Sequence, residues 1–223
     1  MRFKHYKAAI AITAVALISL VICICAVSCS AKKLVYKNVY YIVCYREPAN
    51  SVSASSLSGT ISSYGGAGYI LNIDGNYLVA VACYYSEQDA KTVCESLKHK
   101  NLDCTVKKIE TENYKISRSL YNKCEKLFTG NLNTLNSLSS LAYDCANKLD
   151  TGEYNQSKAK SIISEIESGL NGLKQANTDN CFSEHINMLT AQCDDKGKGY
   201  VFSKDLRYIQ IAVIDVIVNI KLV

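Results

Sequence analysis

The stretch that decides the fold covers residues 77–109 and reads YLVAVACYYSEQDAKTVCESLKHKNLDCTVKKI. It opens with an apolar run of strand length, and Ser86 then stands where a helix cap is expected. A helical pattern follows from Glu87 to Lys100, and after a polar break residues 104–109 form a second strand pattern. The stretch therefore predicts one strand-helix-strand unit.

A looser copy of the same unit precedes it. Residues 39–45 predict a strand, residues 51–63 a weak helix and residues 69–73 a second strand. Asp74-Gly75 joins the two copies, and this dipeptide between apolar runs is a strong hairpin signal, because both turn positions need positive φ. We therefore predict a βαββαβ domain at residues 37–110.

Helical spacing replaces the strand pattern from Asn113 onward. Apolar stripes recur at intervals of three and four residues, and turn residues, for example at 129–131, separate them into successive helices. The last helical pattern begins at Ser203 and is apolar on more than one side, which is typical of a helix that lies between layers. We therefore predict an all-α antiparallel helical bundle at residues 111–223.

Residues 8–28 form an uncharged apolar segment near the start of the chain. At about 1.5 Å per residue, a helix of this length spans the hydrocarbon layer of a bilayer, about 30 Å thick. We therefore predict one transmembrane helix at residues 8–28, a cytoplasmic tail at residues 1–7 and a linker at residues 29–36, with the rest of the chain outside the membrane. Small residues before Cys29 also fit a bacterial lipoprotein signal, so a lipid anchor on this cysteine remains an alternative.

The formal net charge of +5 comes from the first 33 residues. Five of the 25 lysines and arginines lie there and no acidic residue does, so the remaining chain carries 20 basic and 20 acidic side chains. A neutral body argues against nucleic-acid binding, which needs a patch of Lys and Arg to neutralise phosphates.

The 11 cysteines show no CxxC motif, and several stand where a helix or strand pattern calls for an apolar side chain. We interpret them as small buried apolar residues, with one or two disulfides as the alternative. A zinc site is not expected, because only His99 and His185 follow the apolar segment. No nucleophile with an oriented base and no phosphate-binding loop is recognisable, so we predict neither an enzyme nor a cofactor.

The strand-helix pattern resembles the SPOR (sporulation-related repeat) domain family. Residues 77–90 resemble the second half of such a domain, through Ala82, Tyr84, Ser86 and Ala90. A decayed first half is indicated by residues 41–44, Leu57, Ile61 and Gly65-Gly66. SPOR domains bind bacterial cell-wall glycan strands that have lost their stem peptides, on the sheet face away from their helices. The resemblance therefore implies a glycan-binding site on that face.

This glycan-binding site would be formed by two strands and their ends. Its residues by resemblance are Tyr41, Val43, Tyr45, Arg46, Asn76 and Ala80. Strict alternation along residues 77–84 puts Leu78, Ala80 and Ala82 together on one face. The set departs from the family, which tends to have a polar residue where Val43 stands, and it offers tyrosines but few amides for sugar hydroxyls. The face therefore either binds glycan or is covered by the chain itself.

The sequence thus predicts an α+β protein in which a ferredoxin-like βαββαβ SPOR-like domain is followed by the helical bundle and preceded by one transmembrane helix. The predicted function is binding of peptidoglycan glycan strands by a membrane-anchored protein of the bacterial envelope, at division or sporulation septa. In the alternative, the protein is an envelope scaffold whose sheet face is buried by the C-terminal helices, and those helices recruit a protein partner.

Overall fold

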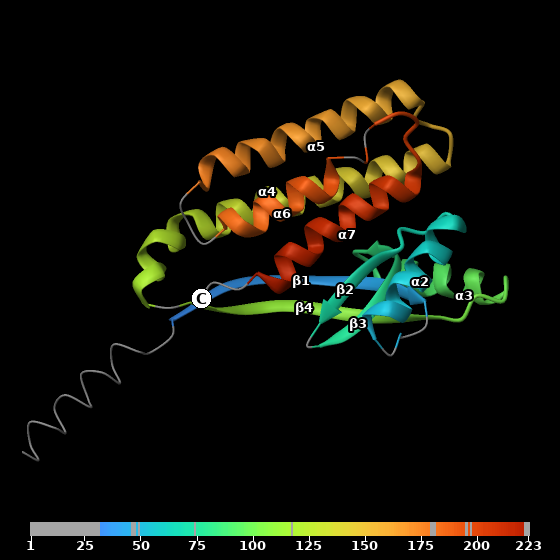
Figure 1. Ribbon diagram of the computed structural model, residues 1–223, viewed down its shortest axis with the longest axis horizontal. Helices are drawn as coiled ribbons and strands as arrows, with labels where there is room; N and C mark the ends of the chain where they lie inside the picture. The colour runs from blue at the N-terminus through green and yellow to red at the C-terminus, as the bar shows by residue number, and fades with distance from the viewer. Residues whose placement is uncertain are drawn as a thin grey trace, which may run out of the picture.

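The computed structural model describes residues 32–220, apart from residues 46–47, 49, 74, 117, 179–181, 195 and 197. The described part is an α+β structure with one sheet and helices on both of its faces (Figure 1). In chain order the elements are β1 (Lys32–Tyr45), α2 (Ser51–Ser63), β2 (Tyr69–Ile73), β3 (Asn76–Tyr84), α3 (Glu87–Lys98), β4 (Cys104–Ile116), α4 (Arg118–Asp150), α5 (Gln156–Ala176), α6 (Ser183–Cys193) and α7 (Ser203–Asn219).

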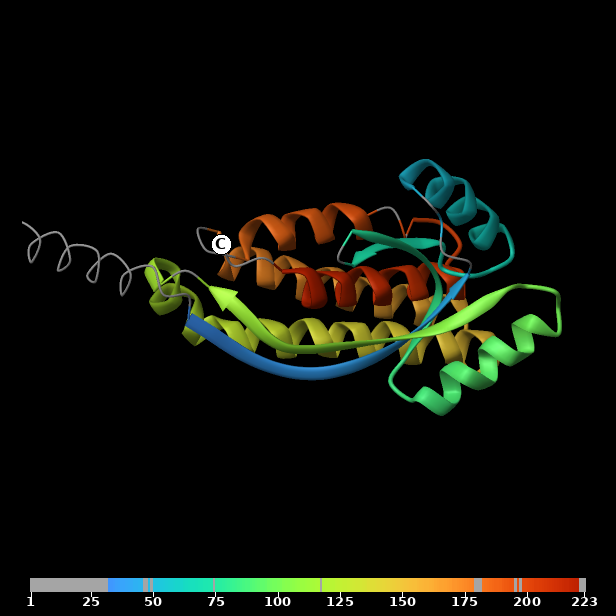
Figure 2. The same ribbon diagram turned by 90° about the horizontal axis from the view of Figure 1, so that it is seen from below.

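The sheet is antiparallel and has the strand order β2-β3-β1-β4. β3 pairs with β1 only from Tyr41 to Tyr45, whereas β4 pairs with β1 along nearly its whole length. β1 and β4 therefore continue past the end of β3 as a curved two-stranded ribbon, which Figure 2 shows. β4 extends to Ile116, so the predicted boundary between residues 110 and 111 falls inside this strand.

The two faces of the sheet contact different helices. Tyr40, Ile42 and Cys44 of β1 belong to the large core that β1 to β4 share with α4 to α7. The alternate side chains of β1 pack toward α2 and α3 in two smaller clusters. α4 and α7 lie on the large-core face, and α5 and α6 pack outside them (Figure 1). The sheet and the C-terminal helices thus share one continuous core.

A β-bulge in β3 changes which side chains share a face. Val43 pairs with Ala82 but Cys44 pairs with Ala80, so Val81 is an extra residue without its own partner in β1. As a result Ala82 packs toward α3, while Ala80 lies in the large core. The predicted strict alternation, which put Ala80 and Ala82 on one face, is wrong because the inserted residue reverses the pattern.

α4 runs without interruption through the turn predicted at residues 129–131. Asn131 is buried in this helix, and its Nδ2 donates a 2.7 Å hydrogen bond to Oδ1 of Asn177, the residue that caps the end of α5. Because the amide is satisfied by tertiary structure, it does not compete with the helix backbone. Gly130 costs the helix about 1 kcal/mol, which the burial of Phe128, Leu132 and other residues of this helix offsets.

α7 is the central helix, as its sequence predicts. It lies between the sheet and the outer helices, and residues on all of its sides are buried. Its two polar residues near the C-terminal end face β2: Tyr69 Oη donates to Asp215 Oδ2 at 2.7 Å, and Asn219 Nδ2 donates to Asp215 Oδ1 at 2.5 Å. Burial raises the pKa of the Asp215 carboxyl above its usual value. These polar contacts join α7 to the edge strand.

The cysteines divide into two kinds. Cys124 is disulfide-bonded, so the alternative of at least one disulfide applies to it. The buried free thiols include Cys83, Cys94, Cys104, Cys145 and Cys193. Burial raises the pKa of Cys193 to about 12, which is consistent with its role as a small core residue.

The described residues do not bear out the transmembrane helix that the predicted fold class includes. Within the described ranges, no helix combines the length and the apolar character that a membrane span needs. The predicted span at residues 8–28 lies outside the described residues. The α+β class and the βαββαβ order of the elements from β1 to β4 agree with the prediction.

Candidate functional site

The six residues predicted for glycan binding do not form one surface. Val43 is buried against α3, whereas Ala80 is buried on the opposite face. Tyr41 and Tyr45 are partly buried on the side of α2 and α3, not on the side away from them. The expectation that these β1 side chains lie on the sheet face away from the helices was therefore wrong. They pack toward α2 and α3, and the alternate side chains of β1 lie in the core shared with α4 and α7.

The other two predicted residues do not complete such a surface. Asn76 is exposed at the start of β3, on the turn that follows β2. Arg46 lies outside the described residues. The sheet face away from α2 and α3 is closed: Gln210 Nε2 of α7 donates to the Cys83 carbonyl at 3.1 Å, and Tyr114 Oη donates to the Ile217 carbonyl at 2.6 Å.

An open groove lies beside the ribbon at the point where β3 ends. Its volume is about 610 Å³, and we call it the ribbon groove. It is lined by Lys37, Asn38, Val39, Tyr85, Glu110, Thr111 and Glu112. Because β3 stops at Tyr84, the ribbon has no third strand here, and the irregular register between Val35 and Asn38 adds a local bend to β1.

A hydrogen-bonded network holds the base of the ribbon groove rigid. Asn38 Nδ2 donates to Tyr40 Oη at 2.8 Å and to Asn136 Oδ1 at 2.9 Å, and Tyr40 Oη donates to the same Asn136 oxygen at 3.1 Å. Tyr40 is fully buried, and this burial raises the pKa of its phenol. Thr111 Oγ1 donates to the Tyr36 carbonyl at 2.9 Å. The groove is therefore pre-formed on the core.

Tyr85 forms an aromatic wall of the ribbon groove. Its hydroxyl lies 2.8 Å from Ser139 Oγ on α4 and accepts a 3.3 Å hydrogen bond from Ser140 Oγ. Its ring packs edge-on against Tyr143, with 5.5 Å between ring centroids, and tilted against Tyr40 at 6.0 Å. Burial raises the pKa of Tyr85, so the phenol stays neutral and keeps its proton for hydrogen bonding.

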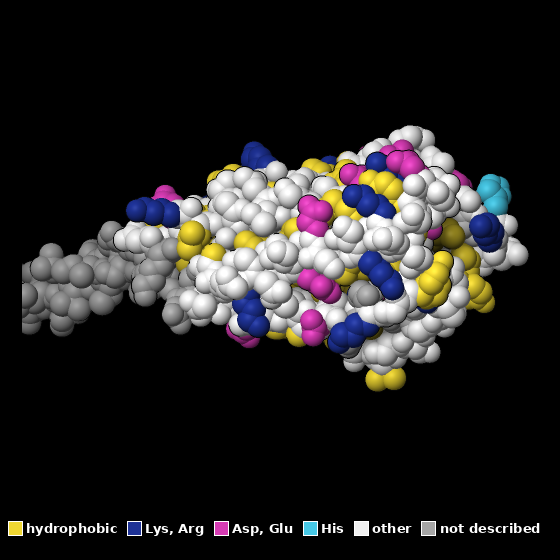
Figure 3. Space-filling model, turned by 90° about the horizontal axis from the view of Figure 1, so that it is seen from above, with side chains coloured by type: hydrophobic (Ala, Val, Ile, Leu, Met, Phe, Trp, Pro, Cys, Tyr) yellow, Lys and Arg dark blue, Asp and Glu magenta, His cyan; other side chains and the backbone are white. Residues whose placement is uncertain are grey.

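The rim of the ribbon groove carries exposed charges of both signs. Lys37 Nζ lies 3.3 Å from Glu112 Oε1, and Glu110 forms an ion pair with Lys108. Exposed pairs of this kind contribute about 0–1 kcal/mol each, so a ligand can exchange them for its own contacts at little cost. Charges of both signs are also interspersed on the face of the molecule in Figure 3.

The chemistry of the ribbon groove suits binding more than catalysis. Its lining has carboxylates, an ammonium group, an amide, a hydroxyl and an aromatic ring, but no Ser, Cys or His that a base could activate. Within the described ranges, no three His, Cys, Asp or Glu residues gather to hold a metal ion. The sequence pattern does not predict this site, because the predicted last strand ends at Ile109. The continuing apolar residues Tyr114 and Ile116 were the available signal for a longer strand.

A second hollow, of about 430 Å³, lies between the α4–α5 turn and the start of α7. Tyr154, Tyr200 and Phe202 are among its lining residues. The rings of Tyr200 and Phe202 are 64% and 51% exposed and pack on each other with 4.9 Å between centroids. This exposed aromatic pair directly precedes α7 and adjoins the second hollow.

Comparisons with protein-family models, curated proteins and solved structures give no match for this chain. The SPOR resemblance therefore rests on the residues that suggested it.

Proposed function

We propose that the protein is a non-catalytic binding protein of the bacterial envelope, and that it holds a cell-wall glycan strand in the ribbon groove. The observation that carries the proposal is the groove itself: exposed carboxylates and an ammonium group surround a rigid aromatic and amide wall. The sheet face that SPOR domains use is unsuitable in this chain, because α4 and α7 bury it.

A glycan strand matches the chemistry of the ribbon groove. Glu110 and Glu112 can accept hydrogen bonds from sugar hydroxyls, and the Tyr85 ring offers an apolar surface to the C–H face of a sugar. Lys37 can bind the carboxylate of a muramic acid unit. The volume lies within the range of about 300–1,000 Å³ that is usual for small-molecule sites, which is enough for a short stretch of a polysaccharide.

The proposal is tested by co-sedimentation of the full chain with purified cell-wall sacculi, before and after an amidase removes the stem peptides. We expect binding that increases after amidase treatment. In the double variant Glu110→Gln, Glu112→Gln, two charge-assisted hydrogen bonds are weakened, so the affinity should fall about tenfold, equivalent to about 1.4 kcal/mol.

A matched control replaces two exposed glutamates on the outer helices, Glu165 of α5 and Glu184 of α6, with glutamine. This control changes the net charge by the same amount and should bind sacculi like the parent chain. Equal binding by the groove variant and the parent would place the glycan elsewhere. Failure of the parent chain to pellet with either preparation would rule out the proposed function.

A second candidate function is that of a protein scaffold. It is favoured by the exposed pair Tyr200 and Phe202 beside the second hollow, because exposed aromatic residues often anchor protein interfaces. If the parent chain does not bind sacculi, cross-linking of the parent and of a Tyr200→Ser, Phe202→Ser variant in envelope extracts would test this function. A cross-linked partner that persists in the variant would contradict a docking role for the aromatic pair.

A further inference from the structure

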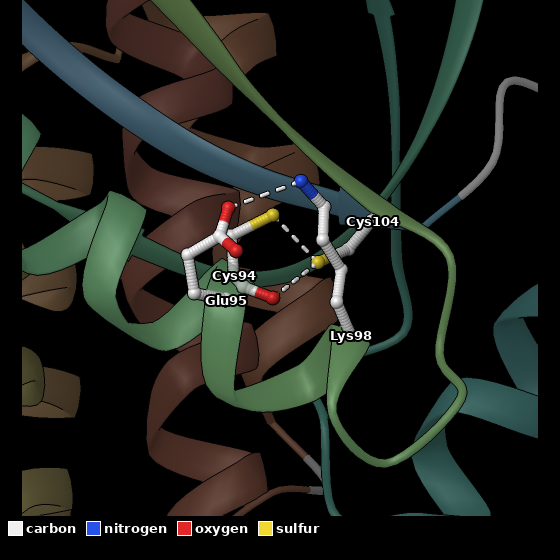
Figure 4. A network of polar contacts seen from close by, with 4 residues as sticks. All are labelled: Cys94, Glu95, Lys98 and Cys104. Carbon is white, nitrogen blue, oxygen red and sulfur yellow. Dashed lines mark hydrogen bonds and ion pairs between the residues drawn. The ribbon is translucent and has the colours of Figure 1, made fainter.

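Two buried thiols from different elements meet beneath α3. Cys94 lies on the inner side of α3, Cys104 is the first residue of β4, and their Sγ atoms are 2.6 Å apart (Figure 4). Cys104 Sγ also lies 3.0 Å from the Cys94 carbonyl oxygen. The side chains are only 3% and 1% exposed. The two sulfur atoms are therefore held in direct contact and away from water.

The local structure fixes this contact from both sides. Ser86 caps α3 by accepting from the Asp89 backbone N–H at 3.3 Å, and Cys104 pairs with Tyr45 in the sheet ladder. The connection between them is short and includes Asn101, which has a φ of 59°. A bond between Cys94 and Cys104 would therefore require no rearrangement of the helix or the strand.

We propose that Cys94 and Cys104 are a redox-active dithiol, which closes to a disulfide by exchange with a low-molecular-weight disulfide and thereby fastens α3 to β4. The proposal does not depend on the glycan-binding function. It is also supported by Cys124, which is disulfide-bonded, because structural disulfides are typical of proteins that mature in an oxidising compartment.

The exchange proceeds in two steps. The Cys94 thiolate attacks one sulfur of the small disulfide, a mixed disulfide forms on Cys94, and one small thiolate leaves. The Cys104 sulfur then loses its proton and attacks the Cys94 sulfur, which releases the second small thiolate. The two protons of the protein thiols end on the two released thiols, so the protein loses two electrons and the small disulfide gains them.

Burial sets the order of the two attacks. Together with the neighbouring Cys94 sulfur, it raises the pKa of the Cys104 thiol to about 12, so Cys104 stays protonated until the mixed disulfide has formed. Access to Cys94 requires local opening of α3. This helix packs in a small cluster around Val43, Ala82 and Ala90, separate from the large core, so it can open without unfolding the rest.

A small cavity adjoins the dithiol. Its volume is about 30 Å³, and Cys104, Leu97 and Leu102 are part of its lining. The cavity is too small for a tripeptide disulfide, which agrees with an exchange that requires α3 to open first. The Lys98–Glu95 ion pair at 3.1 Å lies on the last turn of α3 above the sulfurs (Figure 4). Closure of the disulfide would hold this turn against β4.

The experiment uses the full chain, reduced with dithiothreitol, desalted and then incubated with oxidised glutathione. The protein is denatured, alkylated with N-ethylmaleimide and digested without reductant, and the peptides are identified by mass. We expect a peptide pair that joins Cys94 to Cys104 with a mass decrease of about 2 Da. Amide hydrogen exchange in α3 should slow about tenfold on oxidation, because the disulfide prevents local opening.

The variants Cys94→Ser and Cys104→Ser should lose the cross-linked pair, whereas Cys145→Ser and Cys193→Ser, which replace two other buried free thiols, should keep it. The peptide map of the unsubstituted chain carries the test even where a variant fails to fold. A stable glutathione adduct on Cys94, full alkylation of both cysteines, or a cross-link from either one to a different cysteine would overturn the proposal.

Discussion

Replacement of Tyr69 by phenylalanine tests whether α7 is joined to the sheet through Asp215. The Tyr69 hydroxyl donates a 2.7 Å hydrogen bond to the Asp215 carboxylate. Tyr69 is 4% exposed, so water cannot fully replace the missing hydroxyl. A hydrogen bond to a charged group contributes about 1.5–3 kcal/mol, and we therefore expect Tyr69→Phe to lower the free energy of unfolding by about 2 kcal/mol near neutral pH.

The size of this loss depends on pH, because a carboxylate is the acceptor. Burial raises the pKa of Asp215, while the Tyr69 and Asn219 side chains lower it, so removal of the hydroxyl raises the folded-state pKa further. A raised folded-state pKa means that stability present at low pH is lost as the pH rises through that pKa. The difference between variant and parent should be smallest below about pH 4 and should grow toward neutral pH.

Urea unfolding followed by circular dichroism, at neutral and at acidic pH, measures this difference. Tyr208→Phe is a matched control, because Tyr208 packs edge-on against Tyr69 with 4.9 Å between ring centroids and also loses only a hydroxyl. We expect this control to change the free energy of unfolding by less than about 0.5 kcal/mol. An equal loss for Tyr69→Phe at both pH values would refute the assignment of its effect to the Asp215 carboxylate.

Three further predictions concern stability, each measured by urea unfolding against the parent chain. Asn131→Ala should lower the free energy of unfolding by about 1–3 kcal/mol, because it leaves the buried partner amide at the end of α5 without its 2.7 Å hydrogen bond. A loss below about 0.5 kcal/mol would contradict this role. Gly68→Ala should lower the free energy of unfolding more than Gly75→Ala does. Both glycines have positive φ, but only at Gly68 would the new Cβ lie 2.5 Å from a backbone oxygen of α2. Equal losses would show that φ alone matters. Oxidation of Cys94 and Cys104 to a disulfide should raise the free energy of unfolding by about 3 kcal/mol, because it closes a loop of about ten residues in the unfolded state. An unchanged urea midpoint would argue against a disulfide between them.

Much of the secondary structure could be predicted from local signals. The cap at Ser86, the strand run at residues 77–84 and the turn at Gly75, which has a φ of 83°, all stand where the sequence indicates them. Each depends on residues close together in the chain, such as a side-chain oxygen that accepts from a nearby N–H or a glycine that tolerates positive φ. Signals of this kind act within one element and therefore need no knowledge of its neighbours.

The candidate site could not be predicted in the same way. The ribbon groove exists because β3 ends at Tyr84 while β1 and β4 continue, and its aromatic wall is held by Ser139 of α4. The groove brings together residues near 38, 85 and 111, and no local pattern relates them. The prediction of Tyr41 and Val43 as site residues followed a family pattern in which the sheet face away from α2 and α3 is open. In this chain α4 and α7 bury that face.

The sequence by itself determined the βαββαβ order of the first six elements, the central position of the apolar α7 and the neutrality of the body, because these follow from composition, periodicity and capping. Only the tertiary structure decided which side chains face which helices. The extra residue at Val81 reverses the alternation of β3, and the amide pair of Asn131 with Asn177 allows α4 to continue through Gly130. The contact between Cys94 and Cys104 likewise required a helix and a strand to be docked. Such outcomes depend on partners that are distant in sequence, and their free energy appears only when the elements pack together.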